Sequence, residues 1–340
     1  MKMKPTENLS QDTAAVADSL SVMIQKERAD MYTCNGYLDP YEPTIITADD
    51  RMKVVDWCYG VVDHCQLSRE VVAAAMDMVD RYLSTPSSTT DEALRDQNKF
   101  QLLTITALYV AIKVNERVAV SSDLFAEMSR DAYTAKEIED MELTLLRGLS
   151  WRCNAPTAFQ VGHSILSMIL PHTKCSEMTW GFFLDEMKYL TELAVRDYYF
   201  STQRASTIAL ATIFNAIGDI NISGHERQQL LEAFLCIVEC FDFDDPKLVV
   251  AARKRLHRLL QQENYDDDDV TEEMMMMEVL EASSKYPEIS SSVNSRSRMR
   301  QSLRHYLKEL ELHGQDDPKK SPRLVSQHSS SYRSVCGKAA

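Results

Sequence analysis

The sequence predicts an all-α fold, and three observations support this prediction. Long segments are rich in Ala, Leu, Met, Glu and Lys, which favour helix. Glycine is scarce, with nine residues in a chain of 340, and the Asn-Gly and Asp-Gly pairs of tight hairpins are correspondingly rare. The hydrophobic fraction of 44% is enough for a substantial core. We therefore expect packed helices in about two domains, with additional segments.

The N-terminal segment, residues 1–47, is expected to contain one short helix at 18–32. Apolar residues recur there at helical spacing, and one acidic residue interrupts the stripe: Leu20, Met23, Ile24, Glu27 and Met31.

Residues 48–152 are expected to form the first of two five-helix domains. Its predicted helices are 48–65, 68–84, 98–116, 121–129 and 134–149. The third is apolar nearly all round over 102–114, which is typical of a helix buried at the centre of its domain. The fifth starts with a capping box of Thr134 and Glu137. The Ser- and Thr-rich stretch 84–90 is expected to be a surface loop.

Residues 153–264 are expected to form the second five-helix domain. The predicted helices are 156–171, 180–197, 203–218, 223–240 and 245–262. The two blocks share little sequence, so a duplication is inferred from the number of elements alone.

Residues 265–340 have a different composition from the rest of the chain. An acidic run at 266–269 is followed by four methionines at 274–277 and by Ser-rich stretches. Such a segment buries little apolar surface, so we expect it to be mostly disordered. A helical patch is predicted at 297–312, where one face carries Leu303, Tyr306, Leu307 and Leu310.

The net charge and the cysteine pattern argue against several classes of protein. The formal net charge of −14 argues against a general nucleic-acid binder, which shows a basic footprint. No apolar run approaches the ~20 residues of a membrane helix. The N-terminus lacks the apolar core of a secretory signal, and the eight cysteines form no CxxC pair. We expect reduced thiols and a location in the nucleus and cytoplasm.

The sequence contains none of the common catalytic signatures, namely a Walker loop, GxGxxG after a strand, HExxH or GxSxG. Cys236 and Cys240 lie one helical turn apart, but no second pair completes a metal site, so core cysteines are favoured. The acidic run at 266–269 lacks EF-hand spacing and is read as a solvated linker. We expect a protein that is not an enzyme and has neither a metal nor a cofactor.

Charged residues inside otherwise apolar helices are the most informative feature, because a buried charge is costly unless it is paired. Lys113 ends the apolar stretch of the third helix, and Glu142 lies within the fifth. For these two, the sequence leaves intramolecular pairing and partner binding equally open. For a further set the pattern favours structural ion pairs among its own members: Arg51, Asp56, Asp80 and Arg81.

A series of short motifs resembles the cyclin family, in order and at compatible spacing. In the first block these are RMKVVDW at 51–57, LSRE at 67–70, VDRYL at 79–83, KFQLL at 99–103, ALYVAIK at 107–113 and MELTLLRGLSW at 141–151. The second block adds YLTELA at 189–194 and DYYF at 197–200, which resemble the cyclin C-terminal domain. The resemblance covers about residues 18–262.

The resemblance implies a non-catalytic subunit that binds and activates a cyclin-dependent Ser/Thr kinase and controls cell-cycle progression. Cyclins pack against the αC helix of the kinase and move it, so that its Glu pairs with the ATP-binding Lys. By position, Lys113 and Glu142 are the expected polar anchors. The expected apolar surface around them comprises Val110, Leu146, Trp151 and Cys153.

Many cyclins also have a substrate-docking patch, and part of its pattern is present here in Val54, Trp57, Phe100 and Gln101. However, Asp50, Lys53 and Gly60 stand where that pattern has Met, an aliphatic residue and Glu. Two charged residues weaken an apolar groove, so docking of Arg-x-Leu substrates is in doubt. Trp57 is equally well explained as a core aromatic.

Two alternative functions are a kinase-independent cyclin-fold scaffold and a transcription-related protein with cyclin-like folds. The second calls for an N-terminal zinc ribbon and a basic surface, and the sequence has neither. Kinase substrates and the degradation machinery are further expected partners. Ser321 precedes Pro322 and is flanked by basic residues, so we hypothesise that the bound kinase phosphorylates it and shortens the protein's lifetime. A chance Ser-Pro pair in a Ser-rich tail is the alternative.

Overall fold

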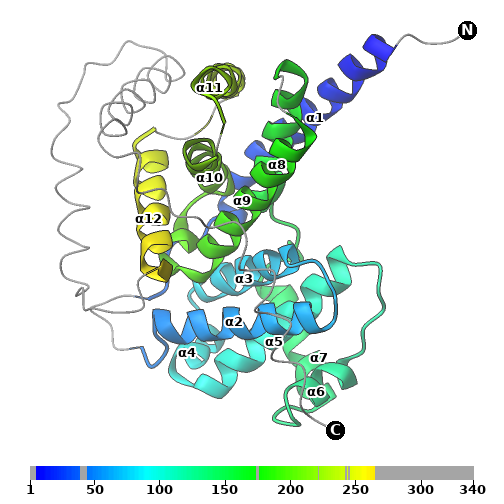
Figure 1. Cartoon of the computed structure of the whole chain (residues 1–340). Coiled ribbons are helices and arrows are strands. Elements are labelled where there is room, and N and C mark those ends of the chain that lie inside the picture. Colours follow the sequence, from blue (N-terminus) through cyan, green and yellow to red (C-terminus); the bar gives the residue numbers. More distant parts are fainter. Residues whose placement is uncertain are drawn as a thin grey trace, which may run out of the picture.

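The computed structural model describes residues 5–38, 44–173, 176–220, 222–241, 243 and 246–264. All regular structure in these residues is helical, and the helices form two groups that lie one above the other in Figure 1. The predicted all-α class is therefore confirmed. Within the same residues, no helix combines the length and the apolar character needed to cross a membrane.

The first group consists of six helices: α2 (Ala48–His64), α3 (Glu70–Leu83), α4 (Ser88–Arg95), α5 (Gln97–Asn115), α6 (Ser122–Met128) and α7 (Ala135–Gly148). Helix α5 is buried along most of its length and packs against α3, α4 and α7. This confirms the prediction that the apolar stretch 102–114 is a central helix.

Helix α4 (Ser88–Arg95) shortens the predicted surface loop over 84–90, because only residues 84–87 lie outside a helix. The helix begins at Ser88 because Ser87 and Thr90 form a reciprocal capping box, in which each side chain bonds to the backbone N–H of the other. Thr90 and Ala93 are buried against the core of the first group. The polar composition of this segment predicted a loop. The short amphipathic helix was not recognised because its two buried residues are small.

The second group consists of five helices, as predicted: α8 (Ala158–Ile169), α9 (Glu177–Arg196), α10 (Ala205–Asp219), α11 (Gly224–Cys240) and α12 (Pro246–Asn264). Helix α10 is buried on all sides and packs against α8, α9 and α12. Each group therefore surrounds its own central helix and has its own hydrophobic core. The boundaries expected at 152 and 264 stay predictions.

Helix α1 (Pro5–Glu27) begins earlier and ends earlier than the predicted helix at 18–32, and a 3-10 turn, η1 (Asp30–Tyr32), follows it. Leu20 and Ile24 are buried in the core of the second group, where α1 packs against α8. Glu27, the polar residue in the stripe, is also buried. Its carboxylate accepts a hydrogen bond from the backbone N–H of Ser206, at 2.9 Å, and so satisfies the N-terminus of α10.

Candidate functional site

Lys113 and Glu142 form a polar pair on the surface of the first group. Packing of α5 against α7 brings the Lys113 Nζ to 2.6 Å from Glu142 Oε1. The same Nζ lies over the ring of Tyr109, 4.5 Å from its centroid. Burial opposes the charge on Lys113, but the hydrogen bond and charge of Glu142 outweigh it, so the pKa of Lys113 is raised. The Lys113 side chain is 40% exposed.

Exposed apolar side chains stand next to this pair in the chain. Val114 follows Lys113 and is 47% exposed, and Leu143 follows Glu142 and is 39% exposed. Trp151 is 66% exposed and comes just after the end of α7. Large apolar side chains at such exposure are typical of contact surfaces. We name Lys113, Glu142, Val114, Leu143 and Trp151 the α5–α7 surface.

The structure places the expected apolar members of this surface at different depths. Leu146 is half-buried, whereas Val110 and Cys153 are buried in the core of the first group. Burial raises the pKa of the Cys153 thiol. These two residues therefore support the surface from beneath. Val114 and Leu143 were missed at the sequence level, although each directly follows one of the two anchors.

Trp151 is held outward by an unusual turn. Ser150 and Trp151 both have positive φ angles, 50° and 63°, a conformation that costs free energy for residues other than glycine. The backbone N–H of Trp151 donates to the Leu146 carbonyl at 2.8 Å, and Arg81 Nη2 donates to the Arg152 carbonyl at 2.9 Å. These two bonds fix the turn and with it the direction of the indole.

Arg81 also connects this turn to η1. Its Nη1 donates to the Met31 carbonyl at 3.1 Å, and its guanidinium lies 5.3 Å from the ring centroid of Tyr32. Arg81 is 4% exposed, and its charge is balanced by Asp77, one helical turn earlier, through bonds of 2.9 and 2.7 Å. Met31, 48% exposed, thus becomes a further apolar residue beside the α5–α7 surface.

The expected structural ion pairs are redistributed in the structure. Arg51 and Asp80 do pair with each other, through bonds of 2.9 and 2.7 Å. Arg81 pairs with Asp77 instead of a member of the expected set. Asp56 pairs with Arg196 of α9 at 2.8 Å, across the boundary between the two groups.

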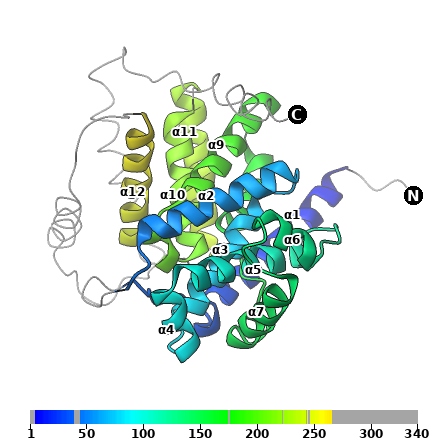
Figure 2. The same ribbon diagram turned by 90° about the horizontal axis from the view of Figure 1, so that it is seen from below.

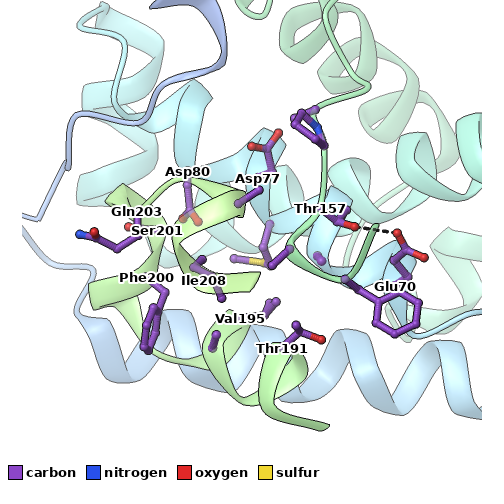
Figure 3. A pocket seen from close by; sticks show the side chains of 18 of the residues that line it. Glu70, Asp77, Asp80, Thr157, Thr191, Val195, Phe200, Ser201, Gln203 and Ile208 are labelled. Atoms are coloured by element: carbon purple, nitrogen blue, oxygen red, sulfur yellow. Dashed lines mark hydrogen bonds between the residues drawn. The ribbon is translucent and has the colours of Figure 1, made fainter. Parts of the chain in front are cut away.

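A cavity of about 230 Å³ lies at this boundary, and Figure 3 shows its lining. Helix α3 contributes carboxylates, α9 contributes Thr191 and Val195, and the 3-10 turn η3 (Tyr198–Thr202) contributes Phe200 and Ser201. On its wall the Thr157 hydroxyl donates to Glu70 at 2.7 Å. Arg69 of the first group pairs with Glu192 of α9 at 2.7 Å beside the cavity, so the cavity lies at the interface that joins the groups.

The residues of the expected substrate-docking patch lie at different depths. Val54 and Trp57 are half-buried and pack against the first core, and Phe100 is 1% exposed. Gln101 is exposed. At the same end of α2, Asp50 caps the helix together with Thr47, and Lys53 pairs with Asp49. Helix capping therefore accounts for Asp50, and the ion pair with Asp49 accounts for Lys53.

Two expectations concern metals and modification. Among the residues that the structure describes, no three or more His, Cys, Asp or Glu side chains are grouped as a metal site. Cys236 and Cys240 are exposed on α11 rather than buried, which corrects their reading as core cysteines. Ser321, the acidic run at 266–269 and the helical patch at 297–312 lie outside the described residues.

Comparison with known proteins follows from this geometry. The fold and the α5–α7 surface define an all-α protein whose first helical group presents a mixed apolar and charged face. Residues 18–154 match the family model of the cyclin N-terminal domain. Over this region the chain is similar to the N-terminal domain of cyclins.

Two curated relatives and one solved structure are among the proteins that are similar to this chain. The chain is 26% identical to G2/mitotic-specific cyclin-B3 of Gallus gallus over 199 residues, which is 58% of this chain and 45% of that protein. It is 27% identical to the Homo sapiens cyclin-B3 over 56% of this chain and 12% of that protein. It therefore spans less than half the length of these relatives. A viral cyclin from herpesvirus saimiri aligns with a TM-score of 0.49 and 14% identity over 76% of this chain and 97% of the viral one.

Proposed function

We propose that this chain is a non-catalytic regulatory subunit that binds and activates a cyclin-dependent Ser/Thr protein kinase and thereby controls cell-cycle progression. The observation that carries the proposal is the α5–α7 surface, in which Lys113 and Glu142 pair across two helices and are each followed in the chain by an exposed apolar residue. A few central anchors within an apolar patch is the usual organisation of a protein interface. The match of residues 18–154 to the cyclin N-terminal domain and the similarity to cyclin-B3 support the same function.

The Lys113–Glu142 pair is arranged for a partner and need not be broken to bind one. An ammonium has three donors, and the bond to Glu142 uses one of them. A carboxylate accepts about four hydrogen bonds, so Glu142 also retains capacity. In the proposed complex Lys113 donates to backbone carbonyls near the kinase αC helix, and Glu142 accepts from kinase donors. Each anchor holds the other in place, which lowers the entropy lost on binding.

The proposal predicts that Lys113→Ala and Glu142→Ala each abolish kinase activation without unfolding the chain. Truncating a central anchor costs ~2–4 kcal/mol of binding, roughly a 30- to 1,000-fold loss of affinity. An exposed ion pair contributes only ~0–1 kcal/mol to folding, so the helical structure should persist. The measurement is a kinase assay with the reconstituted complex, beside circular dichroism of each variant.

The matched control is the double variant Lys136→Ala/Asp140→Ala. These residues form a more exposed pair on the same helix, at 3.4 Å, and their removal should leave activation unchanged. A folded Lys113→Ala/Glu142→Ala chain that activates a kinase as the wild type does would refute the proposed anchors. A folded wild-type chain that captures no kinase would favour the kinase-independent scaffold.

The proposed function also includes a location in the nucleus and cytoplasm and phosphorylation of Ser321. A subunit of a cell-cycle kinase would act in the nucleus and cytoplasm, and fluorescence microscopy of the tagged chain tests this. Phosphorylation of Ser321 by the bound kinase is tested by phosphopeptide mapping of the reconstituted complex. An unmodified Ser321 beside an active kinase would end that hypothesis.

A further inference from the structure

Helix α3 presents an acidic stripe to the cavity between the two groups. Four lining residues, Glu70, Ala73, Asp77 and Asp80, follow one another at intervals of three and four residues, so they share one face of the helix. Within α3, the lining contains three carboxylates and no cation. Figure 3 shows Glu70 well apart from Asp77 and Asp80 along the lining. Between Glu70 and Asp77 the stripe has only the methyl group of Ala73, which leaves room beside the helix.

Two of these carboxylates each keep one oxygen free. Asp77 accepts both bonds from Arg81 on Oδ2, and Glu70 accepts the Thr157 hydroxyl on Oε1. Asp77 Oδ1 and Glu70 Oε2 have no bond to a residue that the structure describes, and neither atom is enclosed by the protein. Both oxygens of Asp80, by contrast, accept bonds from Arg51. The free acceptors of the stripe are therefore on Asp77 and Glu70.

Buried negative charge at the cavity is not fully compensated. Burial raises the pKa of Asp77, although its pair with Arg81 opposes the shift. Burial likewise raises the pKa of Glu192 on α9, although Arg69 opposes the shift. In both cases the arginine offsets only part of the cost of burying the carboxylate. An additional cation in the cavity would lower that cost.

The cations of the lining come from outside α3. Arg51 of α2 is held by Asp80, and Arg69 precedes the first residue of α3 and is held by Glu192. Lys188 of α9 is exposed, and Arg204 is the N-cap of α10. A cationic ligand therefore gains most along α3, where acceptors are free.

The size of the cavity and the spacing of the acceptors limit the ligand. Glu70 and Asp77 are seven residues apart, so their Cα atoms are separated by about 10 Å along the axis of α3. Phe159 and Phe200 also line the cavity, and aromatic faces attract ammonium groups and pack against methylene chains. A cavity of about 150 Å³ holds benzene, so one of about 230 Å³ holds roughly nine heavy atoms. An alkyl diamine of medium length matches both limits.

We propose that this cavity binds a linear alkyl diamine or polyamine, with one ammonium at Asp77 Oδ1, a second at Glu70 Oε2 and the methylene chain across Ala73. Exposed residues of the lining, such as Ser68 and Thr202, leave the cavity open to solvent. The inference does not rest on the proposed kinase partner, because the cavity and the α5–α7 surface are formed by different residues.

Isothermal titration calorimetry of the full-length chain at physiological ionic strength tests the proposal. Octamethylenediamine should bind saturably, with one molecule per chain. Putrescine, whose ammonium groups are closer together, and octylamine, which has one, should each bind at least about tenfold more weakly, because each leaves one carboxylate oxygen unused. Magnesium chloride at the same concentration controls for general attraction of cations to an acidic chain, and it should not displace the diamine.

Glu70→Gln is the sharpest variant, because it keeps an oxygen for Thr157 and places an amide NH₂ where Oε2 was. It should weaken binding of octamethylenediamine by about tenfold, so that the diamine binds no better than octylamine. The matched control is Asp123→Asn, which removes an exposed carboxylate from the first turn of α6 and should change nothing. Ala73→Phe fills the space between the two acceptors and should abolish binding of the diamine.

Three results would overturn the proposal. The wild type could fail to bind octamethylenediamine saturably. It could bind the diamine, putrescine and octylamine equally well, which would show attraction without spanning of two acceptors. Glu70→Gln could bind the diamine at full strength, or lose no more affinity than Asp123→Asn does, which would assign the binding to surface charge. Circular dichroism checks each variant, and if Ala73→Phe does not fold, the isosteric Glu70→Gln decides.

Discussion

Arg51 shows how a single charged residue joins the two helical groups. It is 2% exposed, yet its donors are well used, because Nε and Nη2 bond to Asp80 and Nη1 donates to the Val195 carbonyl at 2.7 Å. Asp80 in turn accepts from the Tyr37 hydroxyl at 2.8 Å. A buried pair of this kind is tolerated only when its remaining hydrogen-bonding capacity is satisfied.

At the residue scale, Arg51→Ala should destabilise the protein by ~3–5 kcal/mol, because it leaves the Asp80 charge buried without its partner. Urea unfolding followed by circular dichroism measures the change. Asp56→Ala is the matched control on the same helix, since its pair with Arg196 is largely exposed and should contribute ~0–1 kcal/mol. If the two substitutions lower the free energy of unfolding equally, burial does not determine the cost of removing one partner of an ion pair.

The sequence indicated correctly that Arg51 and Asp80 needed each other, since both are charges in apolar helices. It did not assign Arg81 to Asp77, although the separation of four residues on one helix was available as a signal. The exposed neighbours Val114 and Leu143 were missed because periodicity cannot tell which apolar residues remain uncovered after packing.

At the element scale, α7 and α3 approach so closely that one position admits only glycine. A Cβ on Gly148 would lie 2.6 and 2.7 Å from ring carbons of Tyr82. Tyr82 is itself buried, and its hydroxyl bonds to Thr89, so the ring cannot easily move aside. Gly60 on α2 is the opposite case, because a Cβ there meets no atom within 4 Å.

Gly148→Ala should therefore lower the free energy of unfolding by ~1–3 kcal/mol through overpacking. Gly60→Ala should raise it by up to ~1 kcal/mol, because alanine favours helix and nothing obstructs its methyl group. Thermal and urea unfolding of the two variants compare the effects directly. If both substitutions stabilise the chain, the contact between α7 and the Tyr82 ring is looser than the structure shows.

The elements differ in how well the sequence predicted them. Helix α5 was recognised because it is apolar nearly all round. The five helices of the second group were predicted from the periodicity of apolar residues and from the residues that start and end helices. Helix α4 was missed because its burial is small and its cap uses Ser87 and Thr90 in place of the common acidic residue. Helix α1 starts well before the predicted residue, since Pro5 at its first turn is compatible with helix.

At the scale of the whole molecule, the proposed kinase binding should not need residues 265–340. The α5–α7 surface belongs to the first group, and Figure 2 shows α6 and α7 on the side of the molecule away from α11 and α12. A chain that ends at Asn264 should activate the kinase as well as the full-length chain does. The measurement is a titration of the kinase with each form.

A chain that ends at Cys240 is the control for this truncation. It lacks α12, which packs against the central helix α10 and contributes Val249, Ala252 and Leu256 to the second core. This form should lose its cooperative unfolding transition. If the chain ending at Asn264 folds but fails to bind, the tail belongs to the kinase interface.

The sequence by itself determined the helical class, the two successive groups and the central position of α5. These follow from local periodicity, capping and the cost of burying charge, which are properties of short stretches of chain. Only the tertiary structure decided that Lys113 meets Glu142, that Arg81 holds the Trp151 turn, and that Met178 and Phe182 on α9 remain exposed. Those outcomes depend on which faces of distant helices cover one another, and no local pattern contains that information.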